Sequence, residues 1–221
     1  MMIFHSTDSR QVPPSVGRSE CGVDPLDLLP ETPLGESGTI CRRFRDLGLM
    51  TFRAACRWVR DVPYGSNRAS RHPEVVFEEM RGTCQSKHSL IATLAQELDL
   101  SVSKYVGAYR LDDSMVEGVG AVLAAHGLTY VPQTHCVLKY DERFFDLTAG
   151  NCHGKKRDVT DMDAYFRVNP FASEAEEHAI YELCVRYYQH SDPILALRSI
   201  AEIRRIAGEC RMKLPMACSA P

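Results

Sequence analysis

Residues 82–98 read GTCQSKHSLIATLAQEL, and this stretch decides the predicted fold. The apolar side chains after the cysteine recur at three- and four-residue steps: Leu90, Ile91, Leu94, Ala95 and Leu98. Because this spacing places them on one face of a helix, we expect an amphipathic helix from residue 84 to about residue 98. Gly82 permits a tight backbone just ahead of it. Cys84 therefore lies in the first turn of the best-defined helix of the chain.

The position of Cys84 favours its reactive form. A helix N-terminus stabilises negative charge, so a cysteine there is more readily a thiolate, which is the nucleophilic species. The backbone N–H of Cys84 can also donate to a developing oxyanion. A cysteine at a helix start is a weak signal by itself, because the chain has nine cysteines and most should be small core residues. A role as nucleophile needs a base and an orienting group as well.

His135 and Asp146 supply the predicted base and orienting group. Residues 134–140 alternate as a strand does, and Asp146 lies in a second apolar segment, 144–148. If Asp141 and Glu142 form a two-residue turn, residue 137 pairs with residue 146, and Asp146 shares the face of His135. Diagonal neighbours on one face lie about 7 Å apart, a gap that two polar side chains can close. A three-residue loop would put them on opposite faces.

Three alternatives compete for these residues. His135 taken alone is more typical of a strand histidine with a structural hydrogen bond than of a catalytic base. His88 is a rival base, since it lies four positions beyond Cys84 on the same helix face, but it lacks an obvious third partner. Zinc-type ligands also occur: Cys84, His88, His135, Cys136, Cys152 and His153. Neighbours on a strand point to opposite faces and no C-x-x-C pair exists, so we expect no metal and no cofactor.

The rest of the chain predicts one α+β domain, with the cysteine helix packed on an antiparallel sheet and accessory helices around it. Residues 1–38 are rich in proline, glycine and serine and predict a mobile arm. The domain spans residues 39–210, and residues 211–221 should form a frayed tail. The expected elements are a helix from about Leu47 to Pro63, a strand at 102–109, a helix at 116–126, strands at 135–140 and 144–148, and two C-terminal helices, the second beginning at Asp192-Pro193.

Composition limits the function classes. Hydrophobic residues make up 44% and charged residues 25%, and the net charge of -3 comes without a long basic stripe. Nucleic acid and membrane are therefore not expected partners, whereas a peptide-like or small amide or acyl substrate is. The run Lys155-Lys156-Arg157 is interpreted as a solvated loop. The N-terminal residues lack a secretory pattern and the unpaired cysteines suit a reducing compartment, so a cytoplasmic location is expected.

The order of the three residues resembles the transglutaminase-like superfamily of papain-like cysteine enzymes, in particular its poorly characterised bacterial members. Residues 82–90 look like the cysteine motif of that group, and 135–140 followed by 145–148 look like its His and Asp strands. Val62-Pro63-Tyr64-Gly65 is similar to an aromatic segment often found ahead of the cysteine. The resemblance covers residues from about 50 to 150.

This resemblance implies a papain-like core with Cys84, His135 and Asp146 as catalytic residues. A thiolate would attack a carbonyl carbon and form an acyl-enzyme, which is released to water or to an amine. Trp58, Tyr64 and Asn67 lie upstream as candidates for a further oxyanion donor, with none assigned. The alternative function is a catalytically silent interaction domain that keeps the fold.

Overall fold

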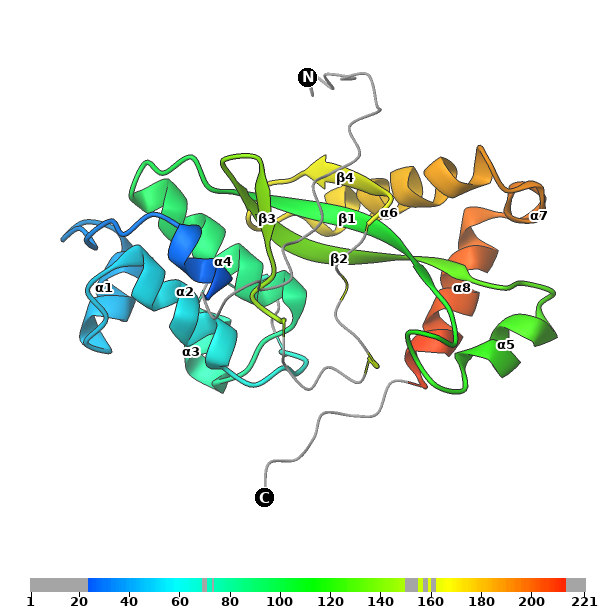
Figure 1. Cartoon of the computed structure of the whole chain (residues 1–221), viewed down its shortest axis with the longest axis horizontal. Coiled ribbons are helices and arrows are strands. Elements are labelled where there is room, and N and C mark those ends of the chain that lie inside the picture. Colours follow the sequence, from blue (N-terminus) through cyan, green and yellow to red (C-terminus); the bar gives the residue numbers. More distant parts are fainter. Residues whose placement is uncertain are drawn as a thin grey trace.

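Figure 1 shows the computed structural model of the chain, in which residues 24–68, 71–72, 74–149, 155–156, 159 and 162–213 are described. The described part is an α+β fold with one four-stranded antiparallel sheet in the order β3-β2-β1-β4. The strands are β1 (Ser103–Leu111), β2 (Val131–Tyr140), β3 (Arg143–Phe145) and β4 (Ala164–Arg167). The helical elements are η1 (Pro25–Leu28), α1 (Thr39–Asp46), α2 (Phe52–Asp61), α3 (Val75–Glu79), α4 (Cys84–Glu97), α5 (Val119–Ala125), α6 (Glu174–Gln189), α7 (Pro193–Ala196) and α8 (Ile200–Arg211).

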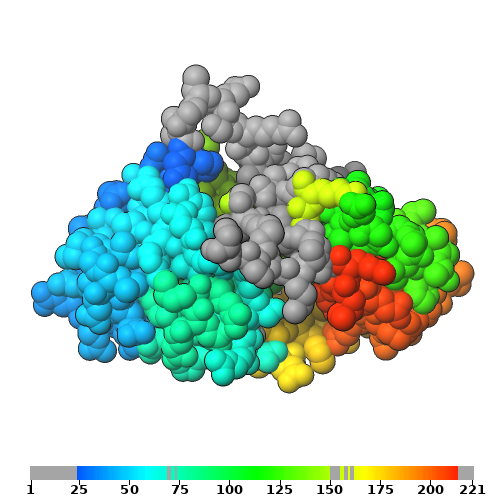
Figure 2. All heavy atoms as spheres, turned by 90° about the horizontal axis from the view of Figure 1, so that it is seen from below, coloured from blue at the N-terminus to red at the C-terminus, as the bar shows by residue number. Residues whose placement is uncertain are grey.

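Two apolar clusters lie toward opposite ends of the long strands β1 and β2. The first joins α1 to α4 with Leu138 and Phe145, and the second joins α5 to α8 with Leu111 and Val131. In Figure 1 the N-terminal helices α1 to α4 accordingly lie toward the left end of the long strands, and the C-terminal helices lie toward the right end. Figure 2 shows the same division on the molecular surface. The two long strands therefore connect both clusters, and β2 runs between them.

Helix α4 begins at Cys84 because Thr83 caps it. The Thr83 hydroxyl accepts from the Ser86 N–H at 3.4 Å, and the Ser86 hydroxyl accepts from the Thr83 N–H at 3.0 Å. The helix is present as predicted, but its first half is not amphipathic. Its polar side chains there are buried along with the apolar ones: Ser86, Lys87, His88 and Ser89. Buried polar groups need partners, so this end of α4 carries specific contacts.

The hairpin β2–β3 has the predicted register. Asp141 and Glu142 form the two-residue turn with φ values of 46° and 59°, as a type I′ turn requires. Leu138 pairs with Phe145 and Tyr140 with Arg143. One more step along this register places residue 146 opposite residue 137. The second strand is shorter than predicted, because β3 ends at Phe145 and Asp146 follows it directly.

The predicted arm is wrong for residues 24–38. Leu26, Leu29 and Leu34 are buried in the N-terminal cluster, and Arg57 and Arg60 of α2 bind the carboxylate of Asp24. These contacts hold the segment against α2, although its leucines show no helical or strand period. Residues 1–23 of the predicted arm lie outside the described residues, as do residues 214–221 of the predicted tail.

Other boundaries also differ from the sequence prediction. The helix expected from about Leu47 starts at Phe52, because the Thr51 hydroxyl accepts from the Ala54 N–H. The second C-terminal helix begins at Pro193 as predicted, but it is divided into α7 and α8 where Ser199 caps a new helix. The elements that were not predicted are η1, α1, α3 and β4. No helix of the described segments is both long and apolar enough to cross a membrane.

Candidate active site

Cys84 is placed by the backbone on its N-terminal side. Gly82 donates to the Pro63 carbonyl at 3.0 Å, and its own carbonyl accepts from the Gly65 N–H at 3.2 Å. A Cβ atom on Gly82 would lie 2.9 Å from the Ser86 hydroxyl oxygen, so glycine is needed here for space rather than for a left-handed backbone. This short parallel bridge holds Tyr64 beside the start of α4.

The Cys84 thiol favours its charged form. A hydrogen bond from the Cys136 thiol and the charges of His135 and Lys155 lower the pKa of Cys84 well below its ordinary value, against the opposing effect of burial. Cys84 keeps partial exposure, whereas the other free cysteines among the described residues are buried. Burial raises the pKa of Cys41 to about 11 and that of Cys184 to about 12. Cys84 is therefore the described cysteine best suited to react as a thiolate.

His135 and Asp146 meet as predicted from the hairpin register. The Nε2 atom of His135 lies 2.8 Å from Oδ2 of Asp146. The other carboxylate oxygen accepts from the backbone N–H and the hydroxyl of Thr148, both at 2.7 Å. These contacts outweigh burial and hold the pKa of Asp146 well below its usual range. The carboxylate and the nearby Cys84 outweigh burial in the same way and raise the pKa of His135 to about 9.

The second ring nitrogen of His135 is the atom available to the sulfur. Nδ1 is buried, and among the described residues Cys84 is the group within hydrogen-bonding reach of it, a contact that contributes to the pKa shifts of both residues. Because Nε2 is occupied by Asp146, a proton on Nδ1 faces Cys84 rather than any other described residue. An imidazolium at His135 and a thiolate at Cys84 stabilise each other, and the pKa shifts of the two groups have the signs that such a pair requires.

The rival base, His88, is occupied on both ring nitrogens. Its Nε2 accepts from the Leu147 N–H at 2.9 Å, so Nδ1 carries the proton and donates to the Cys84 carbonyl at 2.7 Å. Burial lowers the pKa of His88 to about 4. A neutral ring with both nitrogens bonded to the backbone cannot take a proton from the thiol. His88 instead ties the start of α4 to the segment that carries Asp146.

One of the three upstream oxyanion candidates lies against Cys84. Trp58 stacks on Phe77 with ring centroids 5.4 Å apart, and Asn67 accepts from the Ser86 hydroxyl at 2.7 Å. The phenol of Tyr64, by contrast, is close enough to Cys84 that the thiolate raises the pKa of Tyr64 well above its usual range. Tyr64 is therefore the upstream candidate in contact with Cys84, and the Cys84 backbone N–H donates to its phenol oxygen.

Three neighbours of the site were not predicted. Thr148 fixes Asp146, the Cys136 sulfur lies 3.2 Å from the Gln85 amide oxygen, and Lys155 lies over the Tyr109 ring at 5.4 Å while lowering the pKa of Cys84. Lys155 lies in a loop as predicted, but it is half-buried and its charge reaches Cys84. A hydroxyl two positions after a carboxylate is a local signal that could have indicated Thr148. No such signal exists for Cys136 or Lys155, whose positions depend on the tertiary fold.

The zinc alternative gains no support from the described residues, which contain no group of three or more His, Cys, Asp and Glu side chains able to hold a metal ion. Cys152 and His153, two of its proposed ligands, lie outside the described residues.

A scan against protein-family models, a search of curated proteins and a search of solved structures each find no match to this chain.

Proposed function

We propose that the protein is a cysteine-dependent hydrolase or acyltransferase that acts on an amide or acyl bond through Cys84, His135 and Asp146. The observation that carries the proposal is the 2.8 Å contact from His135 Nε2 to Asp146, which leaves Nδ1 for Cys84. A carboxylate that fixes the ring through one nitrogen and leaves the other for the nucleophile is the arrangement of a catalytic triad.

The proposed reaction begins with attack of the Cys84 thiolate on a carbonyl carbon. A C–S bond forms, and the carbonyl π electrons move to oxygen, where the Cys84 N–H and the Tyr64 hydroxyl donate to the oxyanion. The oxyanion re-forms the carbonyl and expels the leaving group, which takes the proton from Nδ1 of His135. Neutral His135 then takes a proton from water or an amine, which attacks the thioester and regenerates the thiolate.

We further propose that this site belongs to a papain-like core of the transglutaminase-like type. Three features support this assignment: the nucleophile opens a helix that packs on an antiparallel sheet, the base lies on a sheet strand, and the orienting carboxylate follows the next strand. The transglutaminase-like superfamily, which the sequence resembles, has the same order of catalytic residues along the chain: Cys84, then His135, then Asp146.

A catalytically silent interaction domain with the same fold is the competing function. Such a domain has no need for a partly exposed cysteine with a lowered pKa beside an imidazole that a carboxylate holds by its other nitrogen. Perturbed pKa values that cluster at one partly exposed site favour chemistry over a structural role.

Trapping of the acyl-enzyme tests the proposal. Brief reaction with p-nitrophenyl acetate, followed by acid quench and peptide mass spectrometry, should place an acetyl group on Cys84 as a thioester. Neutral hydroxylamine should remove this group but leave acetylated lysines intact. A Cys184→Ala variant serves as control, because Cys184 is buried in the second cluster and should not take part. Acetylation that spares Cys84 while other cysteines react would contradict the proposal.

A further inference from the structure

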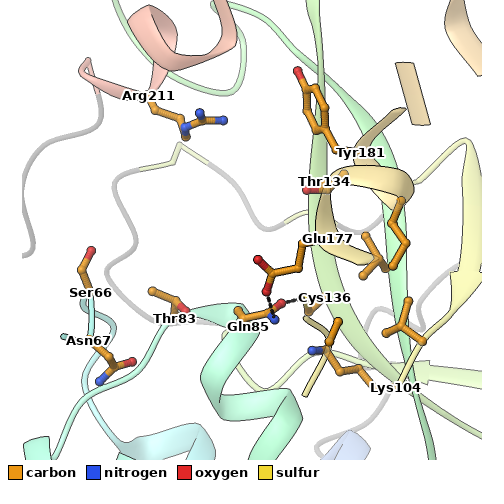
Figure 3. A pocket seen from close by; sticks show the side chains of 14 residues that line it. Ser66, Asn67, Thr83, Gln85, Lys104, Thr134, Cys136, Glu177, Tyr181 and Arg211 are labelled. Carbon is orange, nitrogen blue, oxygen red and sulfur yellow. Dashed lines mark hydrogen bonds between the residues drawn. The ribbon is translucent and has the colours of Figure 1, made fainter. Parts of the chain in front are cut away.

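A cavity of about 540 Å³ lies next to the candidate active site. Its lining includes the residues on both sides of Cys84, namely Thr83 and Gln85, and those on both sides of His135, namely Thr134 and Cys136. Neither Cys84 nor His135 lines it. Figure 3 shows the cavity between the start of α4, β2 and α6. Its volume is in the range of small-molecule sites, and it requires an explanation of its own.

Lys104 is the unusual residue of this lining. It lies on β1 and is only 1% exposed. Its ammonium group donates to the Ser89 hydroxyl at 2.7 Å and to the Pro170 carbonyl at 2.9 Å. Both partners are neutral, and no carboxylate of the described residues forms an ion pair with Lys104. Buried ammonium groups are normally paired with an anion, because removing the charge from water is costly.

No carboxylate among the lining residues competes with an anionic ligand for Lys104. Glu177, the acidic lining residue, accepts from the Gln85 amide at 2.8 Å and is bound by Arg71 from outside the lining. Arg211 adds a second cation, and Figure 3 shows it on the side of the cavity opposite Lys104. The lining thus carries two cations and one carboxylate, and Arg71 already neutralises the carboxylate. The positive charge that remains favours an anionic ligand.

We propose that this cavity binds a small molecule with one carboxylate and a short apolar body, the carboxylate accepting from Lys104. An ammonium group has three N–H donors, and described residues accept from two of them, so we assign the third to the ligand oxygen. A single donor suits a carboxylate better than a phosphate, which is usually held by several donors. The apolar part of the lining suits the body of such a ligand: Val106, Val168, Ala172, Ile180 and Tyr181.

Calorimetric titration with hexanoate tests the site without any turnover, so its outcome is independent of the proposed catalysis. Hexanamide, which has the same chain and no charge, is the matched ligand. We expect hexanoate to bind the parent protein and to bind Lys104→Met about tenfold more weakly or worse, the loss expected for one hydrogen bond to a charged group. Hexanamide should bind both proteins weakly. Lys139→Met is the control, because Lys139 pairs with Glu142 and does not line the cavity.

A second variant covers the case in which Lys104→Met does not fold. Ala172→Phe should fill the cavity and abolish hexanoate binding while circular dichroism shows the parent spectrum. The comparison of hexanoate with hexanamide on the parent protein needs no variant at all. Equal affinity for the two ligands, or equal hexanoate affinity of the parent and a folded Lys104→Met, would overturn the proposal.

Discussion

Replacing the proposed nucleophile, Cys84→Ala, is expected to lower the turnover of p-nitrophenyl acetate by on the order of a million-fold, to the background rate. The reaction as proposed runs through a C–S bond, and no other described cysteine is partly exposed. Alanine is a good helix former, and residue 84 is the first of α4, so the fold should be retained. Initial rates of p-nitrophenol release, measured beside circular dichroism, check both statements.

Cys184→Ala is the matched control for this variant. It makes the same substitution at a buried cysteine in the second apolar cluster, where burial raises the pKa of Cys184 to about 12. Its turnover should stay near that of the parent, although cavity formation lowers its stability. Parent-like activity of Cys84→Ala would exclude Cys84 as the nucleophile.

The second large effect is expected for Asp146→Asn, which should lower kcat by about 10³ to 10⁴. The amide oxygen that replaces Oδ1 can still accept from Thr148, so the amide NH₂ then faces Nε2 of His135. Nε2 must accept from this NH₂, and the proton of neutral His135 moves to Nδ1. The ring then has no lone pair toward the incoming water or amine, and it loses the charge that raises its pKa.

A control separates this effect from the general loss of a carboxylate that accepts a hydrogen bond. Asp163→Asn changes a carboxylate that accepts from the Tyr188 hydroxyl at 2.8 Å, away from the candidate site. It should change kcat little. Stopped-flow measurement of acylation and steady-state kcat should show a severe loss for Asp146→Asn alone. If kcat falls only a few-fold in Asp146→Asn, then Asp146 does not control the tautomer of His135.

The sequence predicted those parts of the site that depend on local rules. Alternation along β2 and a two-residue turn at 141–142 determine the register that places Asp146 near His135. Apolar spacing after Cys84 predicted the helix that begins at this residue. Each of these rules acts over a few residues, so each could be applied without knowledge of the fold.

Features that depend on contacts distant in sequence were not predictable in this way. His88 and His135 were both candidate bases, and the Leu147 N–H, 59 residues from His88, decides between them. Strand β4 is four residues long and pairs with β1, far earlier in the chain. The segment 24–38 packs through isolated leucines that form no periodic pattern, and composition alone suggested an arm. Lys104 forms no ion pair among the described residues, because the fold places its ammonium group beside two neutral groups, the Ser89 hydroxyl of α4 and the Pro170 carbonyl.

The proposed mechanism requires Cys84 to be a thiolate stabilised by protonated His135, and this can be measured by a direct titration of the sulfur. The ultraviolet absorbance of the thiolate is measured against pH for the parent and for Cys84→Ala, and the difference reports Cys84 alone. Because the pKa of Cys84 is lowered and that of His135 is raised to about 9, the difference signal should be fully present at neutral pH. It should disappear only when the pH falls well below about 8.5, the ordinary thiol value. A difference signal that is absent at neutral pH and appears only near or above that value would contradict the account.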